Sequence, residues 1–299
     1  MKRTSYQPKI VVVGSSSIDL ILNTPFHPAP GETIMAESFE NFFGGKGVNQ
    51  AVGVSRLGAQ TYFIGCVGMD PYGQQILRHL IDEGINVGFV KEDSRNETGT
   101  AYVISANGEN SIIVAPSANY SLKPKHIQNA EKVFDAADLV LTQLELSEET
   151  VLKTLELCKK HGKKLGIYAS PARRLSQELI DYASFIVAKT NDLPIIFGEN
   201  HHETILQKLP NRLFVRDGIN STIYYDGNEM KYLRNDPENG KEVFKMGVGD
   251  AFTSGFAVAL CHGNTVNDCV KLGNTISLKV AEKRGSQKGL PHLKDLKLD

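Results

Sequence analysis

The sequence lacks the features that mark several large classes of protein. Lysine and arginine number 33 against 34 aspartates and glutamates, and a net charge of −1 offers no basic excess for nucleic acid or an anionic membrane. No apolar run approaches the ~20 residues that a membrane span needs. The apolar run at residues 10–13 is also too short for the core of a signal peptide. We therefore expect a cytoplasmic protein that binds neither nucleic acid nor membranes.

Cysteine is scarce, and its spacing excludes two kinds of site. The four cysteines are scattered and form no CxxC pair, and the eight histidines show no HExxH spacing. The sequence therefore gives no support to a zinc site or to a dithiol redox centre. In a chain without a secretion signal, we expect the thiols to be reduced and mostly buried.

The sequence does contain a regular alternation of strand-like and helix-like segments. Short apolar runs predict strands at residues 9–13, 61–67, 137–143, 164–169, 185–189, 213–216 and 222–225. Helical spacing of apolar residues predicts helices at 49–57, 73–82, 148–161, 250–262 and 268–283. This alternation predicts a three-layer α/β/α fold with a mostly parallel sheet. No linker or fixed repeat divides residues 1–299, so we expect a single domain.

Two stretches interrupt this alternation. About residues 31–43 and 98–116 lack a helical period, and the second contains Asn107-Gly108 between two β-rich runs. An Asn-Gly pair between such runs is a strong signal for a hairpin turn. We expect these stretches to form a small β-sheet inserted into the α/β domain.

The first segment with a chemical pattern is glycine-rich and precedes a predicted helix. Gly44, Gly45 and Gly47 surround Lys46, and Asn49 follows within the next turn. Glycines allow close approach of the backbone to a ligand, and a helix N-terminus offers free N–H groups. The spacing does not match the P-loop pattern. From the residues alone, a ligand-binding loop and a plain glycine-rich turn both remain open.

The second such segment places two glycines before an acidic residue. Gly247, Val248, Gly249 and Asp250 begin a strongly apolar helical run. Asp250 stands at a natural N-cap position, so helix capping is the structural alternative to a chemical role for this residue. Capping requires neither glycine, whereas phosphoryl transfer uses bare N–H groups for phosphate oxygens and a carboxylate for a hydroxyl proton.

Together, these two segments resemble the signatures of the ribokinase family of sugar kinases, the phosphofructokinase-B type. FGGKGVNQAV resembles the first family signature, and MGVGDAFTSGF resembles the second. Further resemblance lies in VGSSSID, PGE, VGMDPYG, QLE and KRGS, so that it extends over nearly the whole chain. The resemblance implies an α/β domain with a β-sheet lid. It also implies a kinase that uses ATP and Mg²⁺ to phosphorylate a sugar hydroxymethyl group, with ribose or a related pentose as the first expectation.

The resemblance also implies roles for individual residues. The sugar side would be formed by Ser17, Asp19, Gly44, Gly45, Lys46, Asn49, Ala101 and Glu145. The backbone of Gly247, Val248 and Gly249 would form an anion hole, and Asp250 would be the catalytic base. The nucleotide would be contacted by Lys189, Arg216, Gly218 and Asn274, and Asp192 would reach the metal through water.

The nucleotide end departs from the family pattern. Lys189 and Asp192 replace the asparagine and glutamate of an Asn-x-x-Glu motif, and the loop that begins at Arg216 is altered. Ser17 replaces a sugar-binding asparagine, which leaves the particular sugar open. A catalytically weak kinase-fold binding protein, or a nucleoside kinase of the same fold, is therefore the alternative to an active sugar kinase.

Two further expectations concern an ion and a partner. Phe244 replaces the aspartate that helps many family members to bind K⁺, so a monovalent-cation site is doubtful here. The Lys245 ammonium could take the place of the ion, or the side chain could point to solvent. By analogy with the family, we also expect a homodimer formed through the lid.

Overall fold

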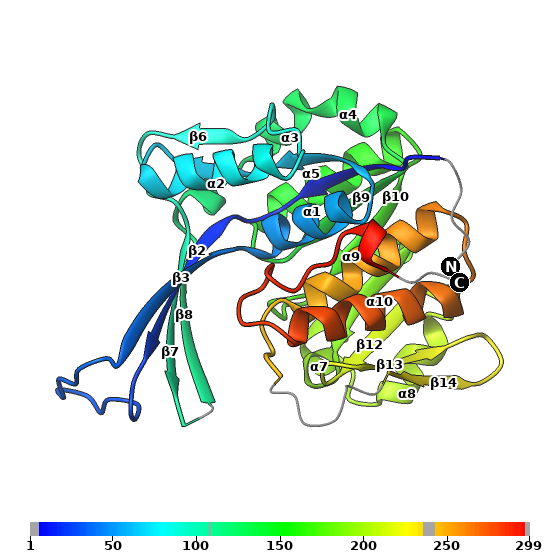
Figure 1. The fold of residues 1–299 in the computed structure, drawn as a ribbon. Coiled ribbons are helices and arrows are strands. Elements are labelled where there is room, and N and C mark those ends of the chain that lie inside the picture. The colour runs from blue at the N-terminus through cyan, green and yellow to red at the C-terminus, as the bar shows by residue number, and fades with distance from the viewer. Residues whose placement is uncertain (1–5, 108, 236–242, 297–299) are drawn as a thin grey trace.

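A mostly parallel eight-stranded sheet forms the centre of the computed structural model, which describes residues 6–107, 109–235 and 243–296 (Figure 1). The strands follow the order β14-β13-β12-β11-β10-β9-β1-β4, and only β13 and β14 are antiparallel to their neighbours. Their bounds are β1 (Lys9–Val13), β4 (Gln60–Ile64), β9 (Leu139–Gln143), β10 (Lys164–Tyr168), β11 (Phe185–Lys189), β12 (Leu213–Asp217), β13 (Ser221–Tyr225) and β14 (Met230–Arg234).

Helices cover both faces of this sheet, as predicted. Successive β1 residues belong to two separate apolar cores, with Val12 in one and Val11 in the other. The first core contains α1 (Lys46–Arg56), α2 (Pro71–Asp82), α9 (Val248–Cys261) and α10 (Val266–Ala281). The second contains α3 (Pro124–Asn129), α4 (Glu131–Ala136), α5 (Glu148–Lys160), α6 (Gln177–Tyr182), α7 (Leu193–Phe197) and α8 (His202–Lys208). Short 3₁₀ turns occur at η1 (Ser117–Ser121), η2 (Thr190–Asp192) and η3 (Leu293–Asp295).

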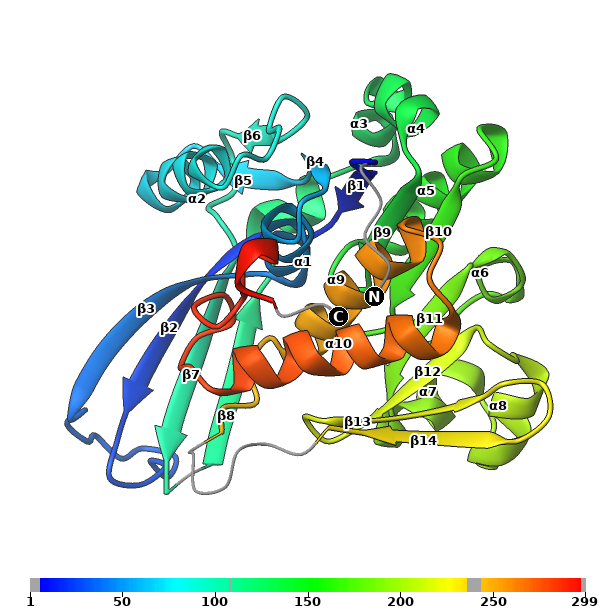
Figure 2. The same cartoon turned by 45° about the vertical axis from the view of Figure 1, so that its right-hand side comes forward.

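A separate four-stranded sheet extends from one side of the domain as a lid (Figures 1 and 2). Its order is β3-β2-β7-β8, with β2 (Ser17–Asn23), β3 (Ser38–Gly44), β7 (Thr100–Ala106) and β8 (Glu109–Ala115). The small sheet was predicted, but β2 was not, and the stretch from residue 31 contributes a strand only from Ser38 onwards. Asn107 has the left-handed φ of 53° that suits a hairpin turn, while Gly108 lies outside the described residues.

The boundaries of several elements differ from the sequence prediction. The strand expected at 61–67 breaks at Gly65, so that β5 (Cys66–Gly68) pairs instead with β6 (Lys91–Asp93). Helix α1 begins at Lys46, earlier than expected. Helix α9 begins at Val248 with Gly247 as its N-cap, so Asp250 lies in the first turn and is not the cap. In the described part of the chain, no helix has the length and apolarity to cross a membrane.

Candidate active site

A cavity of about 600 Å³ lies where the central sheet, the lid and two helix N-termini meet. The sheet contributes side chains at or just beyond the carboxyl ends of its strands, namely Ser15, Glu145, Tyr168 and Lys189. Ligands of open α/β sheets bind at this edge, because the loops that follow the strands diverge there. The cavity therefore brings together most of the residues that the sequence proposed.

The lid supplies an acidic side chain on its inner face. Asp19 lies within β2 opposite Ala101 of β7, and both line the cavity. Asp19 thus belongs to a strand that the sequence did not predict. The Ser17 hydroxyl donates to Asp19 Oδ1 over 3.1 Å. Burial raises the pKa of Asp19 to about 6, and the Ser17 hydrogen bond opposes that rise.

The glycine-rich loop joins the lid to α1. Gly44 ends β3, and Gly45 caps α1 with a φ of 86°. Lys46 Nζ lies 3.2 Å from Glu145 Oε1, while the Lys46 N–H donates to Glu145 Oε2 over 3.1 Å. Burial disfavours the charge on Lys46, but the carboxylates of Glu145 and Asp250 outweigh it and hold the Lys46 pKa above its ordinary value. The loop thus presents a cation fixed by a carboxylate.

The N-terminus of α9 requires both of its glycines. Gly247 adopts a left-handed φ of 72°, and a Cβ there would lie 2.7 Å from the Ser286 carbonyl oxygen. A Cβ on Gly249 would collide with the Tyr168 hydroxyl. The first N–H groups of a helix have no partner within the helix, and its dipole favours an anion there. Gly247, Val248 and Gly249 line the cavity as the anion-hole prediction requires.

Asp250 is buried beside this N-terminus, and helix α1 contacts both of its oxygens. Asn49 Nδ2 donates to Oδ2 over 3.1 Å, and Gln50 Nε2 donates to Oδ1 over 3.0 Å. Burial raises the pKa of Asp250 to about 6, while the Lys46 charge and the two amide hydrogen bonds limit the rise. Asp250 is therefore mostly ionised near neutral pH and can accept a proton from a hydroxyl in the cavity.

Sequence reasoning missed three residues of this centre. Ser15 donates to Glu145, Gln50 donates to Asp250, and Tyr168 packs against Gly249. Two of these residues could have been found from their positions, because Ser15 and Tyr168 stand at or just after the carboxyl ends of predicted strands. Gln50 follows Asn49 within the glycine-rich signature, but nothing in the sequence indicates that both amides reach one carboxylate.

Only part of the predicted nucleotide end faces the cavity. Lys189 lines it, and also lines an adjoining cleft of about 490 Å³ together with Asp192, Lys46 and Glu145. Gly218 occupies an open turn with a φ of 73°. These positions leave Lys189, Asp192 and the Gly218 backbone accessible to a nucleotide.

Arg216 and Asn274, both predicted to contact a nucleotide, have their side chains in the interior. Arg216 is 3% exposed and Asn274 is fully buried. The Arg216 guanidinium donates to Asn274 Oδ1 and to the carbonyl of Ile219, and lies 4.5 Å from the centre of the Phe252 ring. Its Nη1 and Nη2 groups donate to protein atoms, including the Ile219 carbonyl beside Gly218, whereas its buried Nε has no partner among the described residues.

The acidic groups of the cavity fit a magnesium ion shared with phosphates. No group of three or more histidine, cysteine or acidic side chains forms a metal cage within the described ranges. Mg²⁺ bound with a nucleotide uses only one or two carboxylates and keeps several waters. Glu145 and Asp192 line one cleft and offer those carboxylates.

The fold and this cavity define an α/β phosphotransferase with a lid, and comparison with known proteins agrees. Residues 7–293 match the model of the pfkB family carbohydrate kinases. The chain is 35% identical to a ribokinase of Bacillus subtilis over 282 residues, covering 94% of this chain and 96% of the relative. It is 30% identical to a deoxyribokinase of Salmonella typhimurium over 293 residues, covering 95% and 96%.

Solved structures give the same result. A ribokinase from Arabidopsis thaliana, complexed with ribose and ATP, superposes with a TM-score of 0.86 at 26% identity, covering 97% of each chain. A ribokinase from Thermotoga maritima gives 0.84 at 29% identity, covering 96% of this chain and 97% of that one. The chain belongs to the pfkB family of carbohydrate kinases, and its reaction is the transfer of a phosphoryl group to a sugar.

The buried Asp19 predicts a pH-dependent change in stability. The pKa of Asp19 is about 6 in the folded protein against 3.8 for a free side chain, so its ionisation opposes folding above about pH 6 and has no effect below about pH 4. Asp19→Asn should therefore stabilise the ligand-free protein by on the order of 1–3 kcal/mol at pH 8, and by nothing at pH 4.

The measurement is the melting temperature of the two proteins between pH 4 and pH 8. Asp82→Asn, on the exposed side of α2, is the control and should change little at either pH. An equal gain at pH 4 and pH 8 would contradict the assignment, because it could not arise from the Asp19 charge.

Proposed function

We propose that the chain is an ATP-dependent kinase that phosphorylates the hydroxymethyl group of ribose or a closely related pentose in the cytoplasm. The observation that carries this proposal is the Asp250 carboxylate, which lies at the positive N-terminus of α9 and in one cavity with Asp19 and Lys46. The ribokinase and deoxyribokinase relatives support a pentose. The four free cysteines fit a reducing compartment.

In the proposed reaction, Asp250 accepts the proton of the sugar hydroxyl while that oxygen bonds to the γ-phosphorus of ATP. The bond between the γ-phosphorus and the β,γ-bridging oxygen breaks, and ADP leaves with the electron pair. The N–H groups of Gly247, Val248 and Gly249 stabilise the charge on the transferring oxygens. Asp19, Lys46 and Asn49 hold the sugar hydroxyls. Glu145 and Asp192 would hold a Mg²⁺ ion, which would neutralise phosphate charge when bound.

The lid completes the site by excluding water. Its inner face places apolar side chains over the cavity, including Val103, Ile112 and Val114. Water would otherwise compete with the sugar as acceptor of the phosphoryl group. The lid would thereby limit transfer of the phosphoryl group to water.

The central experiment measures ATP consumption across pentoses, hexoses and nucleosides, with Asp250→Asn as the paired variant. We expect the highest kcat/KM for ribose or a related pentose. Asp250→Asn should lower kcat by at least ~10²–10⁴-fold, because it removes the proton acceptor. It should change sugar affinity, measured by calorimetry, much less.

Other outcomes of this experiment have clear meanings. Preference for nucleosides would replace the pentose assignment. Binding of sugar without turnover by the wild-type protein would favour a kinase-fold binding protein. Near-normal turnover by Asp250→Asn would disprove the role of Asp250 as base.

We further propose that activity does not depend on K⁺. Phe244 offers no oxygen ligand at the position where the family carries an aspartate, and Lys245 lines the cavity beside Gly247. Its ammonium carries the same charge as the ion and can organise the same carbonyl groups. The wild-type rate should therefore change less than about twofold when KCl is titrated at constant ionic strength.

The matched variants are Lys245→Ala and Lys271→Ala, the second on the exposed side of α10. Only Lys245→Ala should lose activity, and K⁺ should restore it in part. Strong activation of the wild-type enzyme by K⁺ would refute the proposal.

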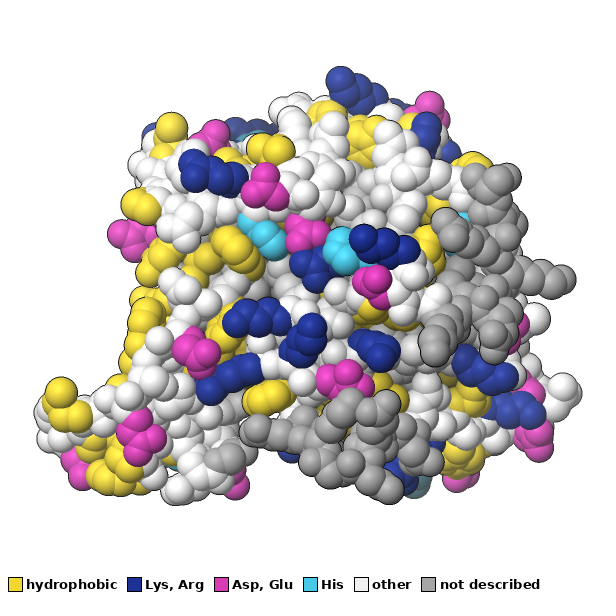
Figure 3. Space-filling view, viewed as in Figure 1, with side chains coloured by type: hydrophobic (Ala, Val, Ile, Leu, Met, Phe, Trp, Pro, Cys, Tyr) yellow, Lys and Arg dark blue, Asp and Glu magenta, His cyan; other side chains and the backbone are white. Residues whose placement is uncertain are grey.

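We also propose that two copies of the chain associate through their lids. Phe39, Tyr102 and Ile113 are 57%, 46% and 68% exposed and share the outer face of the sheet. Hydrophobic side chains gather along the left margin of Figure 3, beside the lid strands. β8 is also an edge strand, and its apolar residues are mostly exposed. Monomeric proteins usually protect such an edge from pairing with another chain.

Sedimentation analysis at tens of micromolar should give the mass of a dimer. Ile113→Lys should give a monomer, because a lysine in the buried centre of such an interface is left unpaired. Ile195→Lys, at an equally exposed isoleucine of α7, should remain dimeric. A wild-type monomer at this concentration would contradict the proposal.

A further inference from the structure

Both oxygens of Asp250 receive hydrogen bonds from amides that are themselves held by other side chains. Asn49 and Gln50 are consecutive residues of α1, and each donates to a different oxygen of Asp250. Behind them, two further amides, Gln287 and Gln143, come from distant parts of the chain. The carboxylate thus lies at the meeting point of two lines of side chains.

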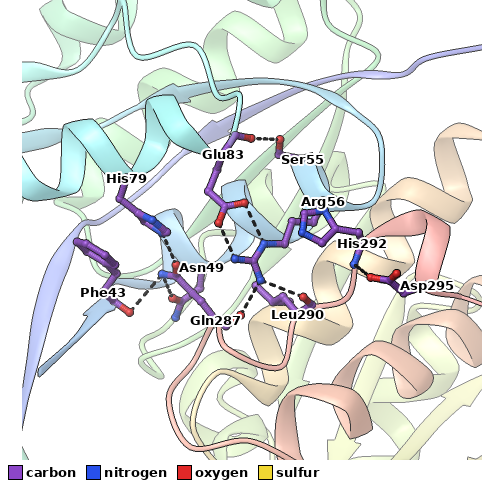
Figure 4. A network of polar contacts seen from close by, with 10 residues as sticks. All are labelled: Phe43, Asn49, Ser55, Arg56, His79, Glu83, Gln287, Leu290, His292 and Asp295. Atoms are coloured by element: carbon purple, nitrogen blue, oxygen red, sulfur yellow. Dashed lines mark hydrogen bonds and ion pairs between the residues drawn. The ribbon is translucent and has the colours of Figure 1, made fainter. Parts of the chain in front are cut away.

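The longer line reaches outward through Gln287 to His79. Gln287 Nε2 donates to Asn49 Oδ1 over 2.8 Å, and His79 Nε2 lies 2.7 Å from Gln287 Oε1 (Figure 4). The shorter line consists of Gln143, whose Nε2 donates to Gln50 Oε1 over 2.7 Å. Asn49, Gln50, Gln143 and Gln287 are all buried.

The charge of Asp250 fixes the direction of every hydrogen bond in the longer line. An ionised carboxylate only accepts, so Asn49 must turn its NH₂ group toward Asp250 and its Oδ1 toward Gln287. Gln287 must then donate from Nε2 and accept at Oε1. His79 must therefore carry its proton on Nε2. Each amide in this line can satisfy its hydrogen-bond partners in only one orientation, provided that the side chain beyond it keeps its own orientation.

The outer end of this line is anchored to three elements. The His79 ring stacks on Phe43 with centroids 4.1 Å apart, and the Phe43 carbonyl accepts from Gln287 Nε2 over 3.2 Å. Arg56 Nη1 donates to the carbonyls of Gln287 and Leu290, each over 2.9 Å. Figure 4 shows Arg56 also paired with Glu83 of the turn after α2. The Gln287 amide is thereby fixed in both position and rotation.

We propose that Gln287 and His79 are positioning residues for phosphoryl transfer, and that Gln143 serves the same purpose on the other side of Asp250. They hold the amides of Asn49 and Gln50 so that both donate to the base. This inference rests on the proposed role of Asp250 as the base. Among the described residues, the side-chain hydrogen bonds to the Asp250 carboxylate come from Asn49 and Gln50, and each of the three acts through the amide next to it.

Such a device is needed because α1 alone does not fix its amide groups. An asparagine or glutamine amide can rotate by a half-turn and exchange its oxygen with its nitrogen at little cost in shape. Turned the wrong way, Asn49 would present a carbonyl oxygen to the Asp250 carboxylate. The repulsion would favour the protonated acid, which cannot accept the hydroxyl proton.

The test is Gln287→Glu, which keeps the shape of the side chain and removes its donor. A carboxylate at this position accepts only, so Asn49 should turn its NH₂ group toward residue 287 and its oxygen toward Asp250. We expect kcat at pH 7 to fall about tenfold or more, and the acidic limb of the kcat–pH profile to move up by about one pH unit or more. The KM for ATP should stay within about twofold, because Gln287 does not line the cavity.

Two other variants keep the test decisive if Gln287→Glu folds poorly. His79→Phe preserves a ring for stacking on Phe43 and removes only the donor to Gln287, so we expect a smaller loss of kcat in the same direction. Gln60→Glu makes the same chemical change at an exposed position of β4 and should leave both kcat and the pH profile unchanged.

The outcomes separate this inference from the proposed function. If Asp250→Asn abolishes turnover while folded Gln287→Glu and His79→Phe retain the wild-type kcat and acidic limb, the positioning role is refuted and the base assignment stands. If Asp250→Asn retains turnover, the base assignment fails first. A loss of kcat in Gln287→Glu without movement of the acidic limb would also overturn the inference, because it would indicate a merely structural effect.

Discussion

Asp250 is a carboxylate with 4% of its surface exposed, and its desolvation works against the negative charge that a base needs. Four contributions from the chain oppose that cost. The N-terminus of α9 offers its dipole, Lys46 offers a cation, and Asn49 and Gln50 offer hydrogen bonds. The balance leaves the pKa of Asp250 near 6, between that of a solvated acid and that of a buried neutral one. Such a value suits proton transfer near neutral pH, since a base works best when its pKa lies close to the working pH.

The need to keep the buried Asp250 carboxylate ionised accounts for much of the architecture around the cavity. Helices α1 and α9 must lie against each other so that consecutive amides of one reach the first turn of the other. Their closeness depends on small residues, because a Cβ on Gly53 of α1 would collide with Ser254 of α9. The parallel sheet places Glu145 and Tyr168 at the same edge. There Glu145 pairs with Lys46, and Tyr168 packs against Gly249. Sheet and helices thus both serve to position one carboxylate.

The sequence predicted well those features that are local. The apolar runs identified β1, β9 and β11, and the helical spacing of apolar residues after Asp250 identified α9. The sequence did not predict features that depend on contacts between distant segments of the chain. β2 follows β1 after only three residues, and the short Gly14-Ser15-Ser16 break does not reveal that the chain passes from one sheet to the other. In the sequence, Arg216 resembles a ligand-binding residue at the surface. In the structure, Asn274, Ser277 and Thr222 enclose its side chain. No sequence pattern connects Gln287 to Asn49.

The lid and the amides that bind Asp250 lie on the same short segment of chain. β3 ends at Gly44 and α1 begins at Lys46, so only Gly45 separates the strand that carries Phe43 from the helix that carries Asn49. Gln287 bonds to both, through the Phe43 carbonyl and the Asn49 amide. Asp19 on the neighbouring strand is held by the same sheet. A displacement of the lid relative to α1 would therefore strain the hydrogen bonds that orient the base. In this way the fold connects the lid to the carboxylate that we propose as the base.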